Sequence, residues 1–364
     1  MASLWENLST DISTDGLNNI ELLNDVREYL NDVINKEMIP GAVILIAKDG
    51  KTIMHEAFGS QQISPIKLPM KKSLLFDIAS LTKIVCTWIS ILKLVEYKLL
   101  DLDSEVKYYL NLPGSNEFGN STISQILKHT SGLPERTFLK QYGSTKNEIV
   151  SGICNEPLVC KPDEKVLYSN RGFIILGEII EKVSNEKLNN FIAREVWNHL
   201  EMKNTFFKPN ENLYNKIAPT EYPDSKGECQ RGIVHDENAM WLGGVAGHAG
   251  VFSNTEDLAK FCSMLMAGGV YKGKRIIDEN LLKESLSNNT IGLNDNRGYG
   301  WVNYIEEDSN YFGHTGFTGT GMWLNLKKDM FVILLSNRVH PDRKRFSSMP
   351  EIRKNVLEKS WKIY

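Results

Sequence analysis

Two residues three positions apart, Ser80 and Lys83, have the types and the spacing that nucleophilic catalysis needs. Between Ser80 and Val95 the only charged side chains are Lys83 and Lys93, a pattern that predicts a buried helix. Residues three apart share one face of a helix, and a buried ammonium is costly unless it is paired or neutralised. Such a lysine can accept the proton of a serine nucleophile, while free amides of the first helical turn stabilise an oxyanion. The alternative is a structural serine beside a lysine that extends to solvent.

The spacing by itself is not specific, because five Ser-x-x-Lys matches occur in the chain. They are Ser64/Lys67, Ser80/Lys83, Ser90/Lys93, Ser104/Lys107 and Ser184/Lys187. Ser64 precedes a proline in a polar loop, Ser90 falls in mid-helix, and the last two pairs lie in charged surroundings typical of solvated surface. Only Ser80 combines the start of a helix, an apolar setting and a nearby lysine, so Ser80 is the predicted nucleophile.

A second pattern, Tyr168-Ser169-Asn170, directly precedes another predicted helix. A tyrosine beside a buried lysine can act as a base toward the serine and then as an acid toward the leaving group. Asn170 can hold Lys83 and hydrogen-bond a substrate amide. Taken alone, a loop tyrosine followed by an asparagine helix cap is the simpler explanation.

A third pattern, His314-Thr315-Gly316, lies in a glycine-rich strand segment. Glycine in a strand lets a substrate backbone approach closely. The amide of Phe317 is then a candidate second oxyanion donor, next to the amide of Ser80. The alternative is a flexible glycine-rich hairpin.

The apolar patterning predicts strands near both ends of the chain and helices between them. Expected helices cover residues 20–34, 80–95, 122–129, 172–183, 188–200 and 351–361, with one more after a cap at Thr255; expected strands cover 42–47, 52–58, 299–304, 311–317, 322–326 and 330–336. Residues 204–240 read as long loops. This order indicates the α/β (α+β) class, with one antiparallel sheet built from both termini, flanked by the terminal helices, and an inserted mainly helical domain.

The expected organisation has four parts. Residues 1–18 form a flexible segment over the surface. Residues 19–79 and 290–364 form the sheet domain, and residues 80–289 form the helical domain. The active site is expected between these two domains.

Composition excludes several classes of function. The chain has 364 residues, 41% of them hydrophobic and 24% charged, and a net charge of −3, which gives no electrostatic case for nucleic acid or an anionic membrane. No signal-peptide pattern opens the chain, and no apolar run reaches membrane-spanning length. Five widely spaced cysteines suit free thiols in a reducing compartment. We therefore expect a cytoplasmic protein, with its oligomeric state left open.

In this order, the patterns Ser-x-x-Lys, Tyr-x-Asn and His-Thr-Gly resemble the motifs of the serine β-lactamase and penicillin-binding-protein superfamily. Over about residues 20–360 the chain is similar to the branch that holds class C β-lactamases, D-amino-acid-processing peptidases and related esterases. Further stretches that resemble the family are residues 79–83, 129–134, 168–172 and 243–250. The last, with residues 234–239 before it, resembles members that process peptidoglycan fragments, including a muropeptide amidase type. The resemblance implies a β-lactamase/transpeptidase-like fold.

The resemblance also implies roles for individual residues. Ser80 is the nucleophile with Lys83 as its partner, and Tyr168 is the base and then the acid. The implied substrate-binding residues are Asn170, His314, Thr315, Gly316 and Phe317. The implied reaction is acylation of Ser80, expulsion of an amine or alcohol, and hydrolysis by water. It needs no metal and no organic cofactor, and its substrate is a small molecule or short peptide.

The chain departs from the family's β-lactamases at His314, where those enzymes usually have lysine. Histidine is mostly neutral at pH 7 and gains charge below about pH 6.5. We therefore expect an ester or amide substrate whose carboxylate is absent or held elsewhere, and faster acylation by a penicillin, relative to a neutral ester, as the pH falls toward 6. If His314 does not bind the carboxylate, Arg297 and Arg338 are the next candidates.

Two alternatives to an esterase, peptidase or amidase remain open. One is a class C-type β-lactamase, and the other is a penicillin- or peptidoglycan-binding module without turnover. The adjacent residues His235, Asp236 and Glu237 suggest metal ligands at first sight, but three neighbours rarely converge on one ion. We interpret them as a structural loop or as the rim of the substrate site.

Overall fold

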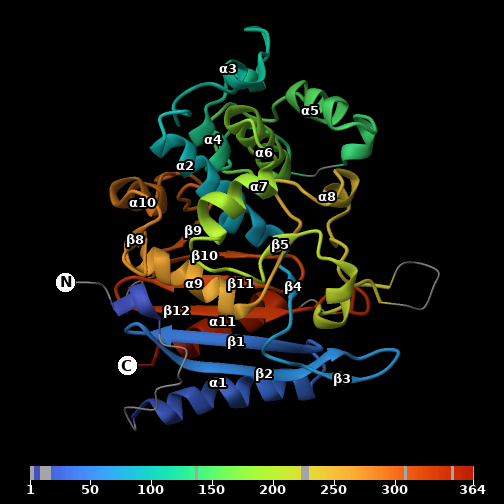
Figure 1. Ribbon diagram of the computed structural model, residues 1–364, viewed down its shortest axis with the longest axis vertical. Helices are drawn as coiled ribbons and strands as arrows, with labels where there is room; N and C mark the ends of the chain where they lie inside the picture. The colour runs from blue at the N-terminus through green and yellow to red at the C-terminus, as the bar shows by residue number, and fades with distance from the viewer. Residues whose placement is uncertain are drawn as a thin grey trace.

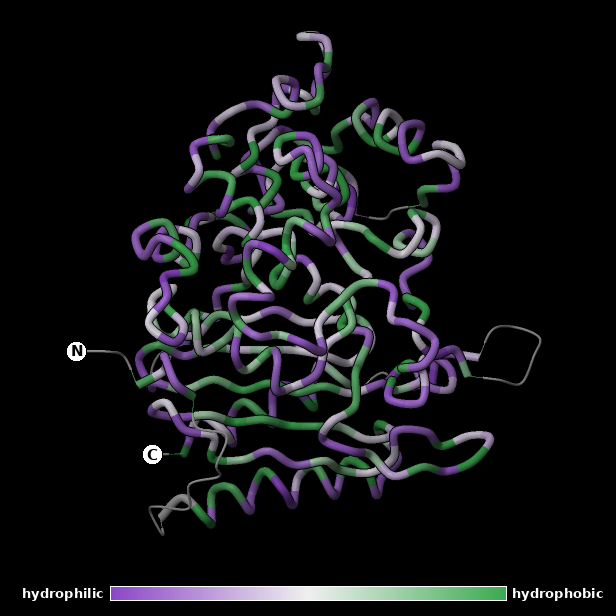
Figure 2. Tube along the Cα trace, in the orientation of Figure 1, coloured by the Kyte–Doolittle hydropathy of each residue, from purple (hydrophilic) through white to green (hydrophobic). Residues whose placement is uncertain are grey.

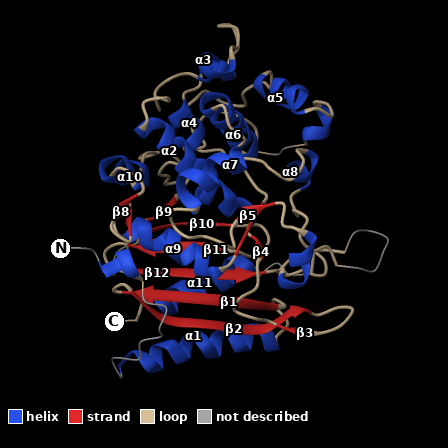
Figure 3. Cartoon of the chain, viewed as in Figure 1, coloured by secondary structure: helices blue, strands red, loops and turns tan. Residues whose placement is uncertain are grey.

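The computed structural model describes residues 4–8, 18–135, 138–222, 229–306, 310–345 and 348–363. Its largest element is a seven-stranded sheet in the order β3-β2-β1-β12-β11-β10-β9, in which neighbouring strands pair antiparallel. The strands are β1 (Gly41–Lys48), β2 (Lys51–Gln62), β3 (Leu68–Pro69), β9 (Val302–Tyr304), β10 (Tyr311–Thr315), β11 (Gly321–Asn325) and β12 (Met330–Ser336). The first and last strands of the chain meet at the centre, so the predicted sheet built from both ends is confirmed (Figure 3).

The central strands β1 and β12 are buried on both faces, which explains their continuous apolar sequences. Val43 and Leu45 of β1 join the core beneath the helical region, whereas Ile44 and Ile46 join a second core on the opposite face. The sheet therefore separates two hydrophobic cores.

Two terminal helices cover one face of the sheet: α1 (Asn18–Asn35) and α11 (Met349–Ser360). Apolar and polar segments alternate along α1 in Figure 2, as expected for a helix with one buried stripe. That stripe, which includes Val26, Leu30 and Val33, packs in the same core as Ile352 and Val356 of α11. The expected helices at 20–34 and 351–361 are thus present, and they contact each other.

The other face carries α9 (Thr255–Met266), which contacts β1 and β12, and beyond it the helical region (Figure 1). The helices of that region are α2 (Ile89–Glu96), α3 (Val106–Leu110), α4 (Ile123–Leu127), α5 (Lys146–Cys154), α6 (Asn170–Ser184), α7 (Leu188–Ile192), α8 (Glu237–Trp241) and α10 (Glu279–Leu286). Part of the range expected in the helical domain therefore packs directly on the sheet. The boundaries of the two expected domains stay a prediction.

Three local expectations differ from the structure. The cap of α9 is Asn254, whose side chain accepts a hydrogen bond from the amide of Asp257, and Thr255 is already helical. The range 204–240, expected as loops, contains the strand β5 (Phe206–Phe207) and part of α8. Of the segment 1–18, Leu4–Asn7 forms a 3₁₀ turn with Trp5 buried against Phe331, so this part does not trail over the surface. Residues 1–3 and 9–17 lie outside the described residues.

Candidate active site

Ser80 lies at a strained turn between a short strand and a buried helix. Strand β4 (Phe76–Asp77) pairs with β6 (Val251–Ser253), and the carboxylate of Asp77 accepts a hydrogen bond of 2.9 Å from the amide of Ala79. Ala79 has φ +46°, a left-handed conformation that is uncommon for a residue with a side chain. Backbone strain of this kind persists where the surrounding structure enforces it, often at functional sites.

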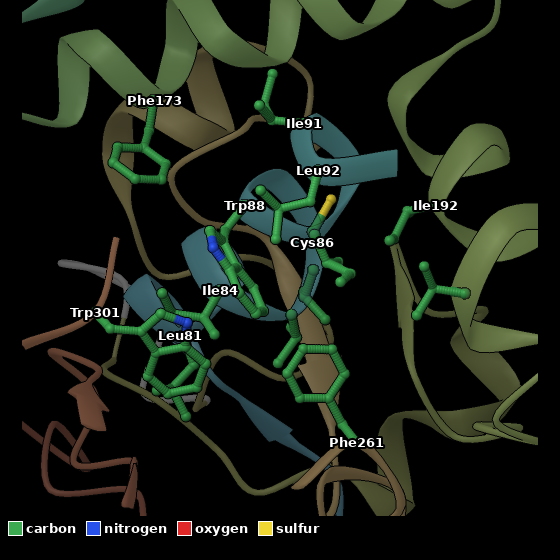
Figure 4. Packing of buried hydrophobic residues seen from close by; sticks show 14 of the residues in the cluster. Leu81, Ile84, Cys86, Trp88, Ile91, Leu92, Phe173, Ile192, Phe261 and Trp301 are labelled. Carbon is green, nitrogen blue, oxygen red and sulfur yellow. The ribbon is translucent and has the colours of Figure 1, made fainter. Parts of the chain in front are cut away.

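The helix that follows Ser80 differs from the expected single α-helix. Ala79–Leu81 is a 3₁₀ turn, Lys83–Trp88 is a π-helical turn, and α2 begins only at Ile89. π-Helical turns are rare in proteins, but those that occur are often found at functional sites. The turn is fixed in the core by Trp88, whose ring packs edge-on against Phe261 and Trp301 (Figure 4).

The side chain of Lys83, which lies one helical turn after Ser80, points at Ser80. Its Nζ donates a hydrogen bond of 3.0 Å to Ser80 Oγ and one of 3.1 Å to the backbone oxygen of His248. The Lys83 side chain is fully buried, and its Nζ lies 5.0 Å from the centre of the Tyr168 ring. The structure therefore joins a serine, a buried lysine and a tyrosine, as nucleophilic catalysis with a neighbouring base requires.

The segment that carries Tyr168 is held by His129, for which no role was predicted. The centres of the two rings lie 4.6 Å apart with their planes tilted by 38°, and the amide of Ser169 donates to His129 Nδ1. Burial, with the positive charges of Arg297 and Lys83, holds the pKa of His129 well below its usual value. A neutral imidazole can accept the Ser169 hydrogen bond, so His129 fixes the tyrosine segment without adding charge to the site.

Asn170 begins α6, next to the site. The expected hydrogen bond from Lys83 to Asn170 is not formed, because the described partners of Lys83 Nζ are Ser80 Oγ and the His248 carbonyl. The Oδ1 atom of Asn170 is buried and has no hydrogen-bond partner. An unpaired buried acceptor is costly, so this atom lacks a compensating hydrogen bond in the structure.

His314 and its neighbours form the end of β10 that faces Ser80. Gly316 has no room for a side chain, since a Cβ there would lie 2.5 Å from the carbonyl oxygen of Ile78. The amide of Gly316 donates to Thr320, which leaves the next amide, that of Phe317, as the oxyanion candidate. On the other side of the site, the amides of Ala79 and Leu81 both have partners, which leaves that of Ser80.

The expectation that His314 becomes a cation below about pH 6.5 is wrong. His314 is buried, and burial together with the charges of Lys83 and Arg297 holds its pKa well below the usual value. Its Nδ1 contacts the backbone oxygen of Thr315 at 3.0 Å, and its Nε2 is buried without a partner. His314 therefore stays neutral at pH 6 and cannot attract a carboxylate by charge there.

A cavity of about 580 Å³ opens in front of Ser80. Its lining residues are Ser80, Tyr168, Arg297, Val302, His314, Thr315, Gly316, Phe317, Arg338, Met349, Pro350 and Arg353. Six of the eight predicted site residues line it, Lys83 lies beneath Ser80, and Asn170 is not in the lining. The described lining includes three guanidinium groups and no carboxylate, so the cavity suits an anionic ligand.

The three arginines differ in how they are held. Arg353, from α11, donates to the carbonyl oxygens of Gly316 and Thr320, and burial together with the nearby Arg338 lowers its pKa to about 10. Arg297 donates through Nε to Asp295, while its Nη1 is buried without a partner. The guanidinium of Arg338 stacks on the Phe317 ring at 4.3 Å. Sequence reasoning found Arg297 and Arg338 as alternatives but missed Arg353, which lies at the far end of the chain.

For the run His235-Asp236-Glu237 the contacts support the structural-loop interpretation, and the rim of the substrate site stays a prediction, since none of the three residues lines the cavity. The side chain of Asp236 caps α8, and the His235 ring stacks on that of Phe317 at 5.8 Å. Among the described residues no group of three His, Cys, Asp or Glu side chains is placed to hold a metal ion. Within the same residues, no helix has both the length and the apolar character to cross a membrane.

Comparison with known proteins agrees with this geometry. The family model described as Beta-lactamase matches residues 26–354. The chain belongs to this family. It is a hydrolase with the β-lactamase/transpeptidase-like fold, and the family's general mechanism passes through an acyl-enzyme.

Individual relatives fit the family assignment. An N-acetylmuramyl-L-alanine amidase of Bacillus subtilis is 29% identical over 342 residues, which cover 83% of this chain and 78% of the amidase. The octameric penicillin-binding protein homologue from Pyrococcus abyssi superimposes with a TM-score of 0.74 at 23% identity, over 94% of this chain and 79% of that one. A class C β-lactamase from Rhodobacter sphaeroides gives a TM-score of 0.73 at 17% identity, over 93% of this chain and 99% of the β-lactamase chain.

Proposed function

We propose that this hydrolase cleaves an amide bond in an N-acyl amino acid or short peptide, and that the substrate carries a free carboxylate. The observation that supports it most is the cavity of about 580 Å³ in which Ser80 faces three arginines and no described carboxylate. The Bacillus subtilis relative, at 29% identity, is named for an amide bond of this type, between a muramyl group and L-alanine. A fragment of peptidoglycan is therefore the proposed natural substrate.

The proposed reaction follows the contacts. Tyr168 removes the Ser80 proton while Lys83, at 3.0 Å, orients the Ser80 hydroxyl, and Tyr168 then protonates the leaving amine. The amides of Ser80 and Phe317 bind the oxyanion, and Asn170 Oδ1 accepts a hydrogen bond from the substrate amide. Water then releases the acyl group from Ser80.

The carboxylate of the substrate is proposed to bind Arg297, because one edge of this guanidinium is buried without a partner. The test compares N-acetylmuramyl-L-alanine with its uncharged alanine amide. We expect kcat/KM to be about 10–100-fold higher for the acid, and Arg297→Ala to remove most of that preference. Arg275→Ala serves as the control, since Arg275 donates to the carbonyl oxygens of Gly268 and Ile277 and does not line the cavity. Equal rates for the two substrates would overturn the carboxylate site.

A second measurement separates the proposed amidase from a class C-type β-lactamase and from a binding module without turnover. Intact-protein mass spectrometry is carried out after exposure to the muramyl substrate, an aryl ester and a penicillin. Turnover of the penicillin at a rate above that of the amide favours a β-lactamase, and a permanent adduct on Ser80 favours a binding module. Because His314 stays neutral, the ratio of penicillin to ester acylation is expected to be constant from pH 8 to 6.

Two further expectations from the sequence remain proposals. The five cysteines form no disulfide, which supports a reducing, cytoplasmic location, and cell fractionation tests it. The cavity lining combines Ser80 and Tyr168 with residues 297–353, which supports a site between the two expected domains. Acylation is then expected to slow amide hydrogen exchange both in β10 and around Tyr168.

A further inference from the structure

Lys83 keeps a buried charge without a carboxylate in contact. Its Nζ donates to Ser80 Oγ and to the His248 carbonyl oxygen, and no described residue forms an ion pair with it. The rings of Tyr168 and Phe173 lie over it at 5.0 and 5.7 Å. A buried ammonium is costly unless negative charge or hydrogen-bond acceptors lie near it. The group that supplies negative charge to Lys83 therefore matters for catalysis.

His248 links Lys83 to such a charge. Its side chain is fully buried, and its Nε2 lies 2.8 Å from Asp236 Oδ1, while its backbone oxygen binds Lys83. The neighbouring Gly247 is fixed as well: its carbonyl accepts from Thr87 Oγ1 at 2.6 Å, and a Cβ on it would lie 2.1 Å from the Phe173 carbonyl oxygen. The loop therefore has no freedom to move the His248 carbonyl independently of its side chain.

Asp236 is itself anchored. Its Oδ1 accepts a hydrogen bond of 2.8 Å from the amide of Ala239, which caps α8, and about a quarter of its side chain is exposed. Burial acts to raise the pKa of Asp236, but His248 and the charge of Lys83 hold it well below its usual value. Asp236 is therefore an anion that responds to the charge of Lys83 across one intervening residue.

We propose that Asp236 and His248 are positioning residues for Lys83. The imidazole, held by Asp236, fixes the carbonyl oxygen that aims Lys83 Nζ at Ser80, and the carboxylate supplies the counter-charge for the ammonium. This inference rests on the proposed function, because it assigns roles within the same catalytic site. Neither residue lines the substrate cavity, so we infer that their effect passes through Lys83.

The expected signature is a change in the pH dependence of the rate. The titratable and charged groups that surround Lys83 are Tyr168 and His129 from the tyrosine side, His314 and Arg297 from the strand side, and Asp236 and His248 from the loop. Of these, Asp236 is the carboxylate that acts on Lys83. Removing its charge is therefore expected to change the pH dependence of kcat/KM.

The test uses Asp236→Asn, which keeps the acceptor oxygen for Ala239 but removes the charge. We expect kcat to fall about 10–100-fold, as for other residues that orient a catalytic group, with KM within about twofold of wild type. The pH profile of kcat/KM is expected to differ from that of wild type. The matched control is Asp257→Asn: Asp257 is a buried carboxylate bonded to the amide of Asn204, outside the site.

A second pair of variants keeps the proposal testable if Asp236→Asn does not fold. His248→Gln retains a donor toward Asp236 and is expected to keep much more activity than His248→Ala. His55→Gln is the control, since His55 contacts Thr255 at the start of α9 and does not line the cavity. If wild type turns over its substrate but these variants behave like their controls, only this inference is wrong. If wild type neither acylates Ser80 nor turns over, the proposed function itself is wrong.

Discussion

Two copies of one motif lie ten residues apart on the same buried stretch, Ser80/Lys83 and Ser90/Lys93, and their surroundings differ. Ser80 faces a cavity, and Lys83 donates to it at 3.0 Å. Ser90 is fully buried in α2 with an unpartnered hydroxyl, and Lys93 forms an ion pair with Glu96. Lys83 hydrogen-bonds the serine of its own motif, whereas Lys93 is neutralised by a carboxylate.

The difference shows what the spacing leaves undetermined. A serine acts as a nucleophile only where its hydroxyl faces a cavity that can hold a substrate. The lysine must also hydrogen-bond the serine hydroxyl rather than another group. At Ser80 the 3₁₀ and π-helical turns provide that opening, while Ser90 lies in regular α-helix. The chain also has a second Tyr-x-Asn match, Tyr109-Leu110-Asn111. The same contrast separates Tyr168, in the cavity lining, from Tyr109, whose Oη accepts a hydrogen bond from the amide of Asp101.

The largest expected effect comes from exchanging the two serines for alanine. Ser80→Ala is expected to lower kcat by a factor on the order of 10⁴–10⁶, because the acyl-enzyme can no longer form. Ser90→Ala is expected to keep full activity, since it removes only a hydroxyl without a partner. Hydrolysis of a short-chain aryl ester measures both. Comparable losses in the two variants would mean that the motifs do not differ in the way described.

The two tyrosines give the next largest contrast. Tyr168→Phe is expected to lower kcat by about 10²–10⁴-fold, the usual range for a general base, without a large change in stability. Tyr109→Phe loses one hydrogen bond at the surface and is expected to keep its activity. The measurement is kcat on the muramyl substrate and the ester. A Tyr168→Phe enzyme within twofold of wild type would make Lys83 the sole base.

The sequence predicts the features of the fold and the site that depend on local patterns, but not those that depend on long-range contacts. Local patterns placed the sheet strands at both chain ends and selected Ser80 by its apolar setting. They could not predict the conformation of Ala79, because it depends on Asp77 and on the long-range pairing of β4 with β6. The neutral state of His314 likewise depends on burial and on charges brought from distant segments.

Residues of the site that are far apart in sequence were the hardest to find. Arg353 reaches the cavity from the C-terminal helix, and His248 binds Lys83 from a loop 165 positions away. Both lay outside the three motifs. Only the spatial arrangement of the folded chain brings them to Ser80.

The two lysines are expected to differ in stability as well as in activity. Lys83→Met removes a buried charge that has no carboxylate in contact, so the free energy of unfolding is expected to rise by about 1–3 kcal/mol while activity is lost. Lys93→Met leaves Glu96 and the carbonyl oxygen of Ile276 without their donor, and is expected to lower stability by about 1 kcal/mol. Urea unfolding of the two variants checks both signs. A destabilised Lys83→Met protein would show that the ammonium is held mainly for structure.

The smallest effect concerns the strained residue before the nucleophile. At φ +46° a side chain is disfavoured and glycine is not, so Ala79→Gly is expected to stabilise the fold by up to about 1 kcal/mol. Ala259→Gly, in the interior of α9, is the control and is expected to cost about 1 kcal/mol, because helical glycine loses more backbone entropy on folding. Opposite signs in thermal unfolding would locate the strain at Ala79. If the relaxed Ala79→Gly protein also loses kcat while its KM is unchanged, the strained turn holds Ser80 in its reactive position.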